Sequence, residues 1–180
     1  PFVVIGLIGV AGAGGLLLTQ GYRMERITVW LDPAASEKGH QTIQGLYAIG
    51  SGGLFGKGLG QSMQKLGFLP EANNDMIFSV ICEELGLFGA LCVLALFFAL
   101  IWRFMVIAVN APDLYGSMIV VGVIAHIGIQ VFINIAVATN TIPNTGIPLP
   151  FISYGGSSLV FMLLEMGLVL SVSRYINVKK

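Results

Sequence analysis

Four stretches of almost uninterrupted apolar residues most constrain what this chain can fold into. They cover about residues 2–18, 85–103, 116–138 and 158–173. A helix needs roughly 20 residues to cross a hydrocarbon core of ~30 Å, so each stretch is close to spanning length. Hydrophobic residues make up 56% of the chain and charged residues 10%, against roughly 25% charged in a soluble domain. We therefore predict an all-α polytopic membrane helix bundle that forms a single membrane domain over 1–180.

Net charge, cysteine spacing and the first residues exclude some further possibilities. The formal net charge is zero, which gives no reason to expect nucleic acid or a polybasic lipid-binding patch. Cys82 and Cys92 are predicted on one helix about 15 Å apart, beyond the ~7 Å limit for a disulfide. A cleaved signal peptide is an alternative for 2–18, but its basic start is missing. Because the chain opens on Pro1 without Met, we expect it to be the later portion of a longer protein.

Two polar connections separate these spans. The segment 19–75 is long for a structureless connection, so we expect it to be functional. The segment 139–157 contains Pro143, Pro148 and Pro150, which forbid a continuous helix.

The short connections predict the orientation, because positive charge concentrates on the cytoplasmic side. The segment 139–157 has no Lys or Arg, whereas the tail after Val172 carries Arg174, Lys179 and Lys180. The C-terminus should therefore be cytoplasmic, and the segments 139–157 and 19–75 should both be extracytoplasmic, although 19–75 carries five basic residues. We attribute that conflict to the length of the segment and to cations that face a ligand.

The glycine-rich run from Ala48 to Gln61 resembles a phosphate-binding loop but matches neither the Walker nor the G-x-G-x-x-G pattern. Two interpretations remain open. Its backbone could approach a ligand, with Lys57 as a point charge, or it could pack as a re-entrant turn.

Asp75 lies where the second apolar helix should begin, at Asp75 or Met76. An Asp at this position is typical of a helix N-cap, and the same carboxylate could serve as a general base. Glu71 lies four residues earlier, but Pro70 opposes a shared helical face.

Acidic residues inside spans need partners. Glu83 and Glu84 are about 100° apart on a helix, so at least one should pair with Arg or Lys, although a substrate or proton site is an alternative. Glu165 near the middle of the last span costs about 2.5 to 3.5 kcal/mol by insertion scales. It should face protein or trapped water.

The third span carries polar residues at i, i+4 and i+8, namely His126, Gln130 and Asn134. Such a stripe should face the bundle interior, and it most often makes interhelical hydrogen bonds. Glu165 is expected near it.

Several ordered motifs resemble those of the SEDS family, the FtsW, RodA and SpoVE proteins of bacterial division, elongation and sporulation. The motifs are WLDP at 30–33, AIGSGGLFGKGLGQS at 48–62, KLGFLPEANNDMIF at 65–78, EELGLFG at 83–89 and GIPLPFISYGGSS at 146–158. The resemblance covers nearly the whole chain. It implies the last four helices of a ten-helix fold.

The resemblance also implies a peptidoglycan glycosyltransferase that polymerises lipid II at the outer face of the bacterial cytoplasmic membrane, with a class B penicillin-binding protein. The catalytic acid of the family's P-E-A-x-x-D motif falls on Asp75. The chain departs from the family pattern at Asn73 and Asn74, where His-Thr is usual, and at Met76, where Phe is common.

This activity requires a base for the acceptor hydroxyl and cations for the departing diphosphate. We expect Asp75 to be the base, and the stabilising group to be a cation of the long connection, with or without a divalent ion. An apolar groove would hold the lipid tail. The candidate substrate-binding residues are Lys57, Lys65, Arg23, Arg26 and Glu71, and the supporting residues are Glu83, Glu84, Glu165, His126 and Gln130.

Two other functions stay open from the residues alone. Intramembrane acids and a Pro-broken connection also suit a lipid flippase or transporter. A scaffold for the penicillin-binding protein is the third option. The motifs do not separate division, elongation and sporulation members, and we expect the 180-residue chain by itself to be inactive.

Overall fold

The structure, a computed structural model, describes residues 21–34, 39–64 and 74–176, with side chains from Met24 onward. The predicted all-α class is confirmed, because these residues form helices and no strand. The helices are α2 (Gly21–Leu31), α3 (His40–Ser51), α4 (Ile77–Val109), α5 (Leu114–Ala138) and α6 (Gly156–Arg174). The predicted first span, 2–18, lies outside the described residues.

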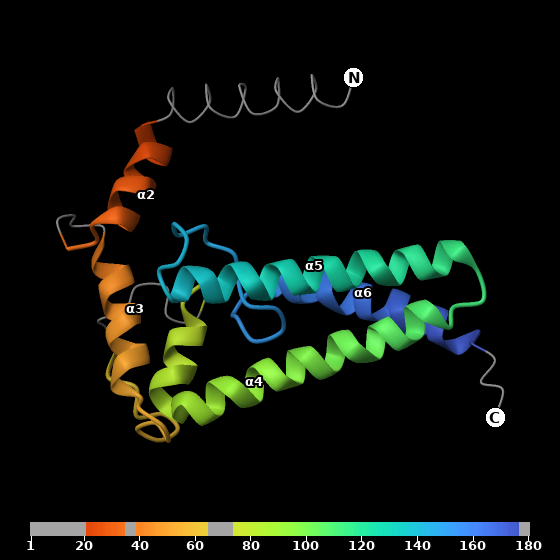
Figure 1. Cartoon of the computed structure of the whole chain (residues 1–180), viewed down its shortest axis with the longest axis horizontal. Coiled ribbons are helices and arrows are strands. Elements are labelled where there is room, and N and C mark those ends of the chain that lie inside the picture. Colours follow the sequence, from red (N-terminus) through yellow and green to blue (C-terminus); the bar gives the residue numbers. More distant parts are fainter. Residues whose placement is uncertain (1–20, 35–38, 65–73, 177–180) are drawn as a thin grey trace.

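Helices α4, α5 and α6 pack side by side along most of their length (Figure 1). Each is long and apolar enough to cross a membrane. Helices α4 and α6 extend beyond the predicted spans at both ends, and α5 extends beyond its span at the start alone. The buried contact between them consists of apolar side chains, among them Phe97, Phe104, Val120, Ile127, Met162 and Val169.

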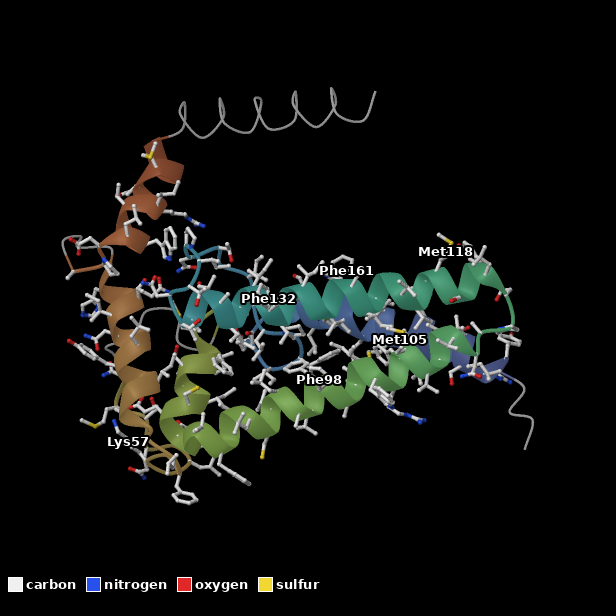
Figure 2. The ribbon with its side chains drawn as sticks, viewed as in Figure 1. Lys57, Phe98, Met105, Met118, Phe132 and Phe161 are labelled. Carbon is white, nitrogen blue, oxygen red and sulfur yellow. The ribbon has the colours of Figure 1, made fainter. Side chains whose placement is uncertain are left out.

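The outer surface of these three helices is also apolar. Phe98 on α4, Phe132 on α5 and Phe161 on α6 are 77%, 71% and 65% exposed (Figure 2). Exposure of so many large apolar side chains to water would be unfavourable, at about 25 cal/mol per Å². This surface therefore fits lipid or further helices.

Helix α4 is bent at its first third. Its 33 residues would measure about 50 Å if straight, well beyond a ~30 Å hydrocarbon core. Gly86 has φ 68° and ψ −167°, a backbone conformation that side chains other than hydrogen strongly disfavour. The bend turns the short first part, Ile77 to Leu85, away from the long part and toward α3 (Figure 1).

The two ends of the bundle differ in character. Helices α2 and α3, the start of α4 and the 139–155 connection gather at one end (Figure 1). The α4–α5 turn and the end of α6 lie at the other, where Asp113 caps α5 by accepting a hydrogen bond from the Gly116 amide. The long connection predicted at 19–75 thus contains two helices, and it meets the second polar connection at the same end.

Candidate functional site

Asp75 lies at the point where the polar connections meet, and the residue is 8% exposed. The predicted N-cap role is wrong, because Met76 occupies the cap position of α4, and the Met76 side chain makes no capping hydrogen bond. The Asp75 carboxylate instead accepts a 3.4 Å hydrogen bond from Nε2 of Gln41 on α3. Its backbone carbonyl accepts a 2.8 Å bond from Nδ2 of Asn134 on α5.

The connection after α5 fixes the backbone around this acid. Asn134 also donates to the Ile147 carbonyl at 2.8 Å, so one buried amide ties the connection to Asp75. Ser153 Oγ donates to the Asn74 carbonyl at 2.6 Å and accepts from the Leu149 amide at 2.7 Å. These bonds hold the acid between α5 and the 139–155 connection, so its position does not depend on one contact.

A cavity of about 370 Å³ opens beside the acid. Asn74, Asp75, Gly146, Pro148 and Tyr154 line it. Gly146 has φ 71°, which lets the connection turn there without a side chain at the rim. The Asp75 carboxylate thus borders a space that could admit a substrate group, although the side chain is largely buried.

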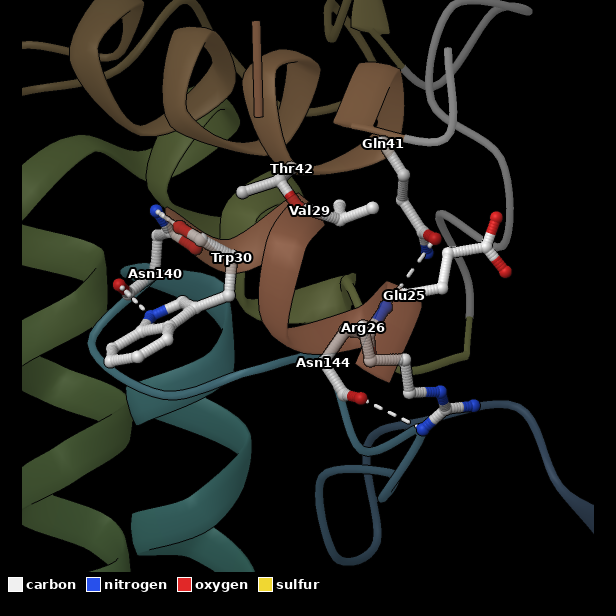
Figure 3. A pocket seen from close by; sticks show the side chains of 8 residues that line it. All are labelled: Glu25, Arg26, Val29, Trp30, Gln41, Thr42, Asn140 and Asn144. Carbon is white, nitrogen blue, oxygen red and sulfur yellow. Dashed lines mark hydrogen bonds between the residues drawn. The ribbon is translucent and has the colours of Figure 1, made fainter. Parts of the chain in front are cut away.

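Arg26 is linked to Asp75 through the backbone carbonyl and side chain of Asn144 and then the side chain of Gln41, and Figure 3 shows the part of this link from Arg26 to Gln41. Its Nη1 donates to the Asn144 carbonyl oxygen at 2.8 Å, and Asn144 Nδ2 donates to Gln41 Oε1 at 3.4 Å. Gln41 then donates to Asp75. The sequence did not single out Gln41 or Asn144, because neither belongs to a periodic pattern. They meet only when α3 and the connection after α5 come together in the fold.

Glu83 forms a separate buried centre at the bend of α4. Its side chain is 0% exposed and accepts from Lys57 Nζ at 2.7 Å, from Ser62 Oγ at 2.5 Å and from the Gln64 amide at 3.4 Å. The prediction that Glu83 or Glu84 pairs with a cation is confirmed. Lys57 lies at the tip of the turn after α3 (Figure 2), and its ammonium binds Glu83 rather than Asp75.

The glycine-rich run packs against this bend, as one of its two interpretations proposed. The amides of Lys57 and Gly58 donate to the carbonyls of Glu83 and Glu84 at 2.9 and 3.0 Å. A Cβ on Gly56 would lie 2.2 Å from the Glu84 carbonyl oxygen. The close approach that these glycines permit is therefore made to another helix.

His126 and Glu165 form a third polar centre, between α5 and α6. The expectation that the polar stripe of α5 faces the bundle interior is wrong for His126, whose side chain is 48% exposed. His126 Nδ1 and Glu165 Oε1 are 2.8 Å apart, so Glu165 lies near the polar stripe of α5, as expected. Buried oxygens of Gln130, Glu84 and Glu165 have no hydrogen-bond partner among the described residues.

Three predicted site residues cannot be placed. Lys65 and Glu71 lie outside the described residues, and Arg23 is described only as part of the α2 backbone. Within residues 21–34, 39–64 and 74–176, no three His, Cys, Asp or Glu side chains come close enough to hold a metal ion.

Comparison with known proteins assigns the family. The family model described as cell cycle protein, FtsW/RodA/SpoVE, matches residues 1–178. The chain belongs to this family. Stage V sporulation protein E of Bacillus subtilis (strain 168) is 56% identical over 178 residues, covering 97% of this chain and 48% of that protein. A probable peptidoglycan glycosyltransferase FtsW of Geobacter sp. (strain M18) is 43% identical over 171 residues, covering 94% and 47%.

Solved structures of this family agree with the fold. A chain from a peptidoglycan synthase complex that coordinates polymerization and crosslinking matches with a TM-score of 0.72 and 29% identity, covering 99% of this chain and 50% of that one. The rod shape determining protein RodA of Thermus thermophilus matches with a TM-score of 0.55 and 38% identity, covering 73% and 39%. The chain spans about half the length of the curated FtsW and SpoVE relatives.

Proposed function

We propose that the full-length protein is a peptidoglycan glycosyltransferase that polymerises lipid II, with Asp75 as its general base. The observation that carries this proposal is the Asp75 carboxylate at the wall of a cavity, hydrogen-bonded to Gln41. Relatives named as probable peptidoglycan glycosyltransferases support the reaction class. Asp75 and Gln41 both lie within these 180 residues.

In the proposed reaction, Asp75 takes the proton of an acceptor sugar hydroxyl. The hydroxyl oxygen then forms a bond to the anomeric carbon of the donor, and the bond from that carbon to the diphosphate breaks. The diphosphate leaves with the bonding electron pair, so a nearby cation lowers the energy of the transition state. Burial of Asp75 strengthens its interaction with the reacting groups, because the local dielectric constant is low.

Arg26 is the proposed cation for the leaving group. Among the described cations it is the one linked to Asp75, through Asn144 and Gln41. A guanidinium suits phosphate oxygens because it offers paired N–H donors. Lys65, Arg23 and Glu71 remain proposed substrate contacts, and so does Lys57 if its ammonium, now bound to Glu83, reaches the substrate on binding.

The proposed location is the bacterial cytoplasmic membrane. The Asp75 end of the bundle would face outward, and the end that bears Arg103 and Arg174 would face the cytoplasm, following the distribution of positive charge. The match to a peptidoglycan synthase complex supports a class B penicillin-binding protein as the partner.

The test uses full-length protein purified in detergent with lipid II, where no membrane separates compartments. We expect wild-type protein to form polymer and Asp75→Asn to lose about 10²- to 10⁴-fold in rate, the usual contribution of a general base. Asp113→Asn is the matched control, because Asn caps α5 equally well at the far end of the bundle. Absence of polymer from wild-type protein would favour a flippase or a scaffold instead.

A further inference from the structure

A second cavity is lined by Gln41, the residue that donates to the Asp75 carboxylate. It measures about 170 Å³ and is formed where α2, α3 and the connection after α5 meet (Figure 3). On the order of ten water molecules would fit, which is comparable to one sugar ring. Its polar lining includes Arg26, Trp30, Gln41, Thr42, Asn140 and Asn144.

The wall of this cavity is ordered by bonds between its own residues. Trp30 Nε1 donates to the Asn140 carbonyl at 2.9 Å, which fixes the indole ring at one side (Figure 3). Asn144 Nδ2 donates to Gln41 Oε1, and Arg26 donates to the Asn144 carbonyl. A ligand would therefore meet a preformed surface, which lowers the entropy cost of binding.

The charge of the lining separates the candidate ligands. Glu25 and Arg26 contribute one negative and one positive charge, so their formal sum is zero. A polyanion such as a free diphosphate would call for an excess of cations, and a lipid tail would call for an apolar lining. Three carboxamides, a hydroxyl and an indole suit an uncharged ligand that has many hydroxyl and amide groups.

We propose that this cavity is a saccharide subsite, which binds the N-acetylated sugar that the lipid-linked donor carries next to its diphosphate. The inference rests on the proposed glycosyltransferase function. Carboxamides both donate and accept, so they match neighbouring sugar hydroxyls, and the indole packs on the apolar face of the ring. Arg26 at the edge of the cavity then contacts the diphosphate.

The subsite also gives Gln41 a role. Its Nε2 bonds the Asp75 carboxylate while its Oε1 accepts from Asn144 in the cavity wall. The donor sugar and the acceptor hydroxyl would thus be connected through one side chain. A transferase needs this arrangement, because both reactants must be held together in a productive orientation.

Binding can be measured without turnover. Full-length protein that keeps Trp30 as its only tryptophan, with Trp102 and any other replaced by Phe, is titrated while Trp30 fluorescence is recorded. One probe is a short-chain prenyl diphosphate that carries the disaccharide of lipid II, and the other is the same prenyl diphosphate without sugar. The saccharide probe should produce a saturable change, and the sugar-free probe should produce none at the same concentration.

Thr42 supplies a matched pair of variants. Thr42→Val removes the hydroxyl at nearly constant volume and should weaken saccharide binding about fivefold, as expected for one lost hydrogen bond. Thr42→Ser keeps the hydroxyl and should bind within twofold of wild type. Equal binding of both probes, or unchanged affinity in Thr42→Val, would overturn the subsite.

Asp75→Asn separates this inference from the proposed function. It should slow polymerisation by about 10²- to 10⁴-fold while leaving the Trp30 titration unchanged, because Asn keeps the shape of the side chain next to Gln41. Saccharide binding by a protein that never polymerises lipid II would overturn the proposed function and support the subsite. Polymerisation without sugar-dependent binding at Trp30 would support the proposed function and overturn the subsite.

Discussion

Removal of the Lys57 ammonium should destabilise the protein strongly. Lys57→Met leaves the Glu83 carboxylate at 0% exposure without its cation. Breaking a buried ion pair from one side costs about 3–5 kcal/mol. We expect the lower end, about 3 kcal/mol, because Ser62 and the Gln64 amide still donate to the carboxylate. Since 1 kcal/mol shifts Tm by ~2–4 °C in a chain of this size, Tm should fall by roughly 6–12 °C.

The assay is thermal unfolding of detergent-purified protein, followed by circular dichroism. Arg103→Met is the control, because Arg103 is an exposed cation on the same helix and its loss should change stability by less than about 0.5 kcal/mol. Lys57→Met combined with Glu83→Gln should recover part of the loss, since the buried charge is then gone. If Lys57→Met and Arg103→Met have the same Tm, the ion pair does not anchor the glycine-rich turn.

Three further outcomes follow from the packing. Gly52→Ala should destabilise the protein by more than 1 kcal/mol, because the new Cβ would lie 1.9 Å from a carbonyl oxygen of α4. The Cβ of Gly50→Ala meets nothing within 4 Å, so this variant should be neutral or stabilising. The denaturation midpoints of the two variants test this difference. Asn134→Ala should lower the free energy of unfolding by about 1–3 kcal/mol and reduce polymerisation, because it leaves the Asp75 and Ile147 carbonyls unpaired. Asn110→Ala, at an exposed helix end, should change neither the stability nor the polymerisation rate. His126→Ala should lower the free energy of unfolding by about 1.5 kcal/mol, measured by the same melts, and an unchanged melting temperature would show that its bond to the α6 carboxylate contributes nothing.

The sequence predicted the parts of this structure that depend on local pattern. The predicted apolar stretches correspond to α4, α5 and α6, because both the buried faces and the outer faces of these helices are apolar. The spacing of the polar stripe on α5 placed Glu165 near His126 correctly. The adjacent acids at the start of α4 required a cation, and Glu83 has one.

The parts that depend on tertiary contacts could not be predicted. Gly86 gave no sign of a bend, because glycine is common in membrane helices without one. Asp75 precedes a helix as an N-cap would, yet contacts from Gln41 and Asn134 decide its position. The link from Arg26 to Asp75 joins four separate segments of the chain, and no periodicity in the sequence indicates that they meet.

The rate of lipid II polymerisation by Asp75→Asn, at saturating substrate, tests the central claim most directly. The measurement uses folded full-length protein whose Tm matches wild type, with Asp113→Asn alongside. We predict a loss of at least about 100-fold for Asp75→Asn and none for Asp113→Asn. Polymerisation by Asp75→Asn at the wild-type rate would contradict the assignment of this carboxylate as the base.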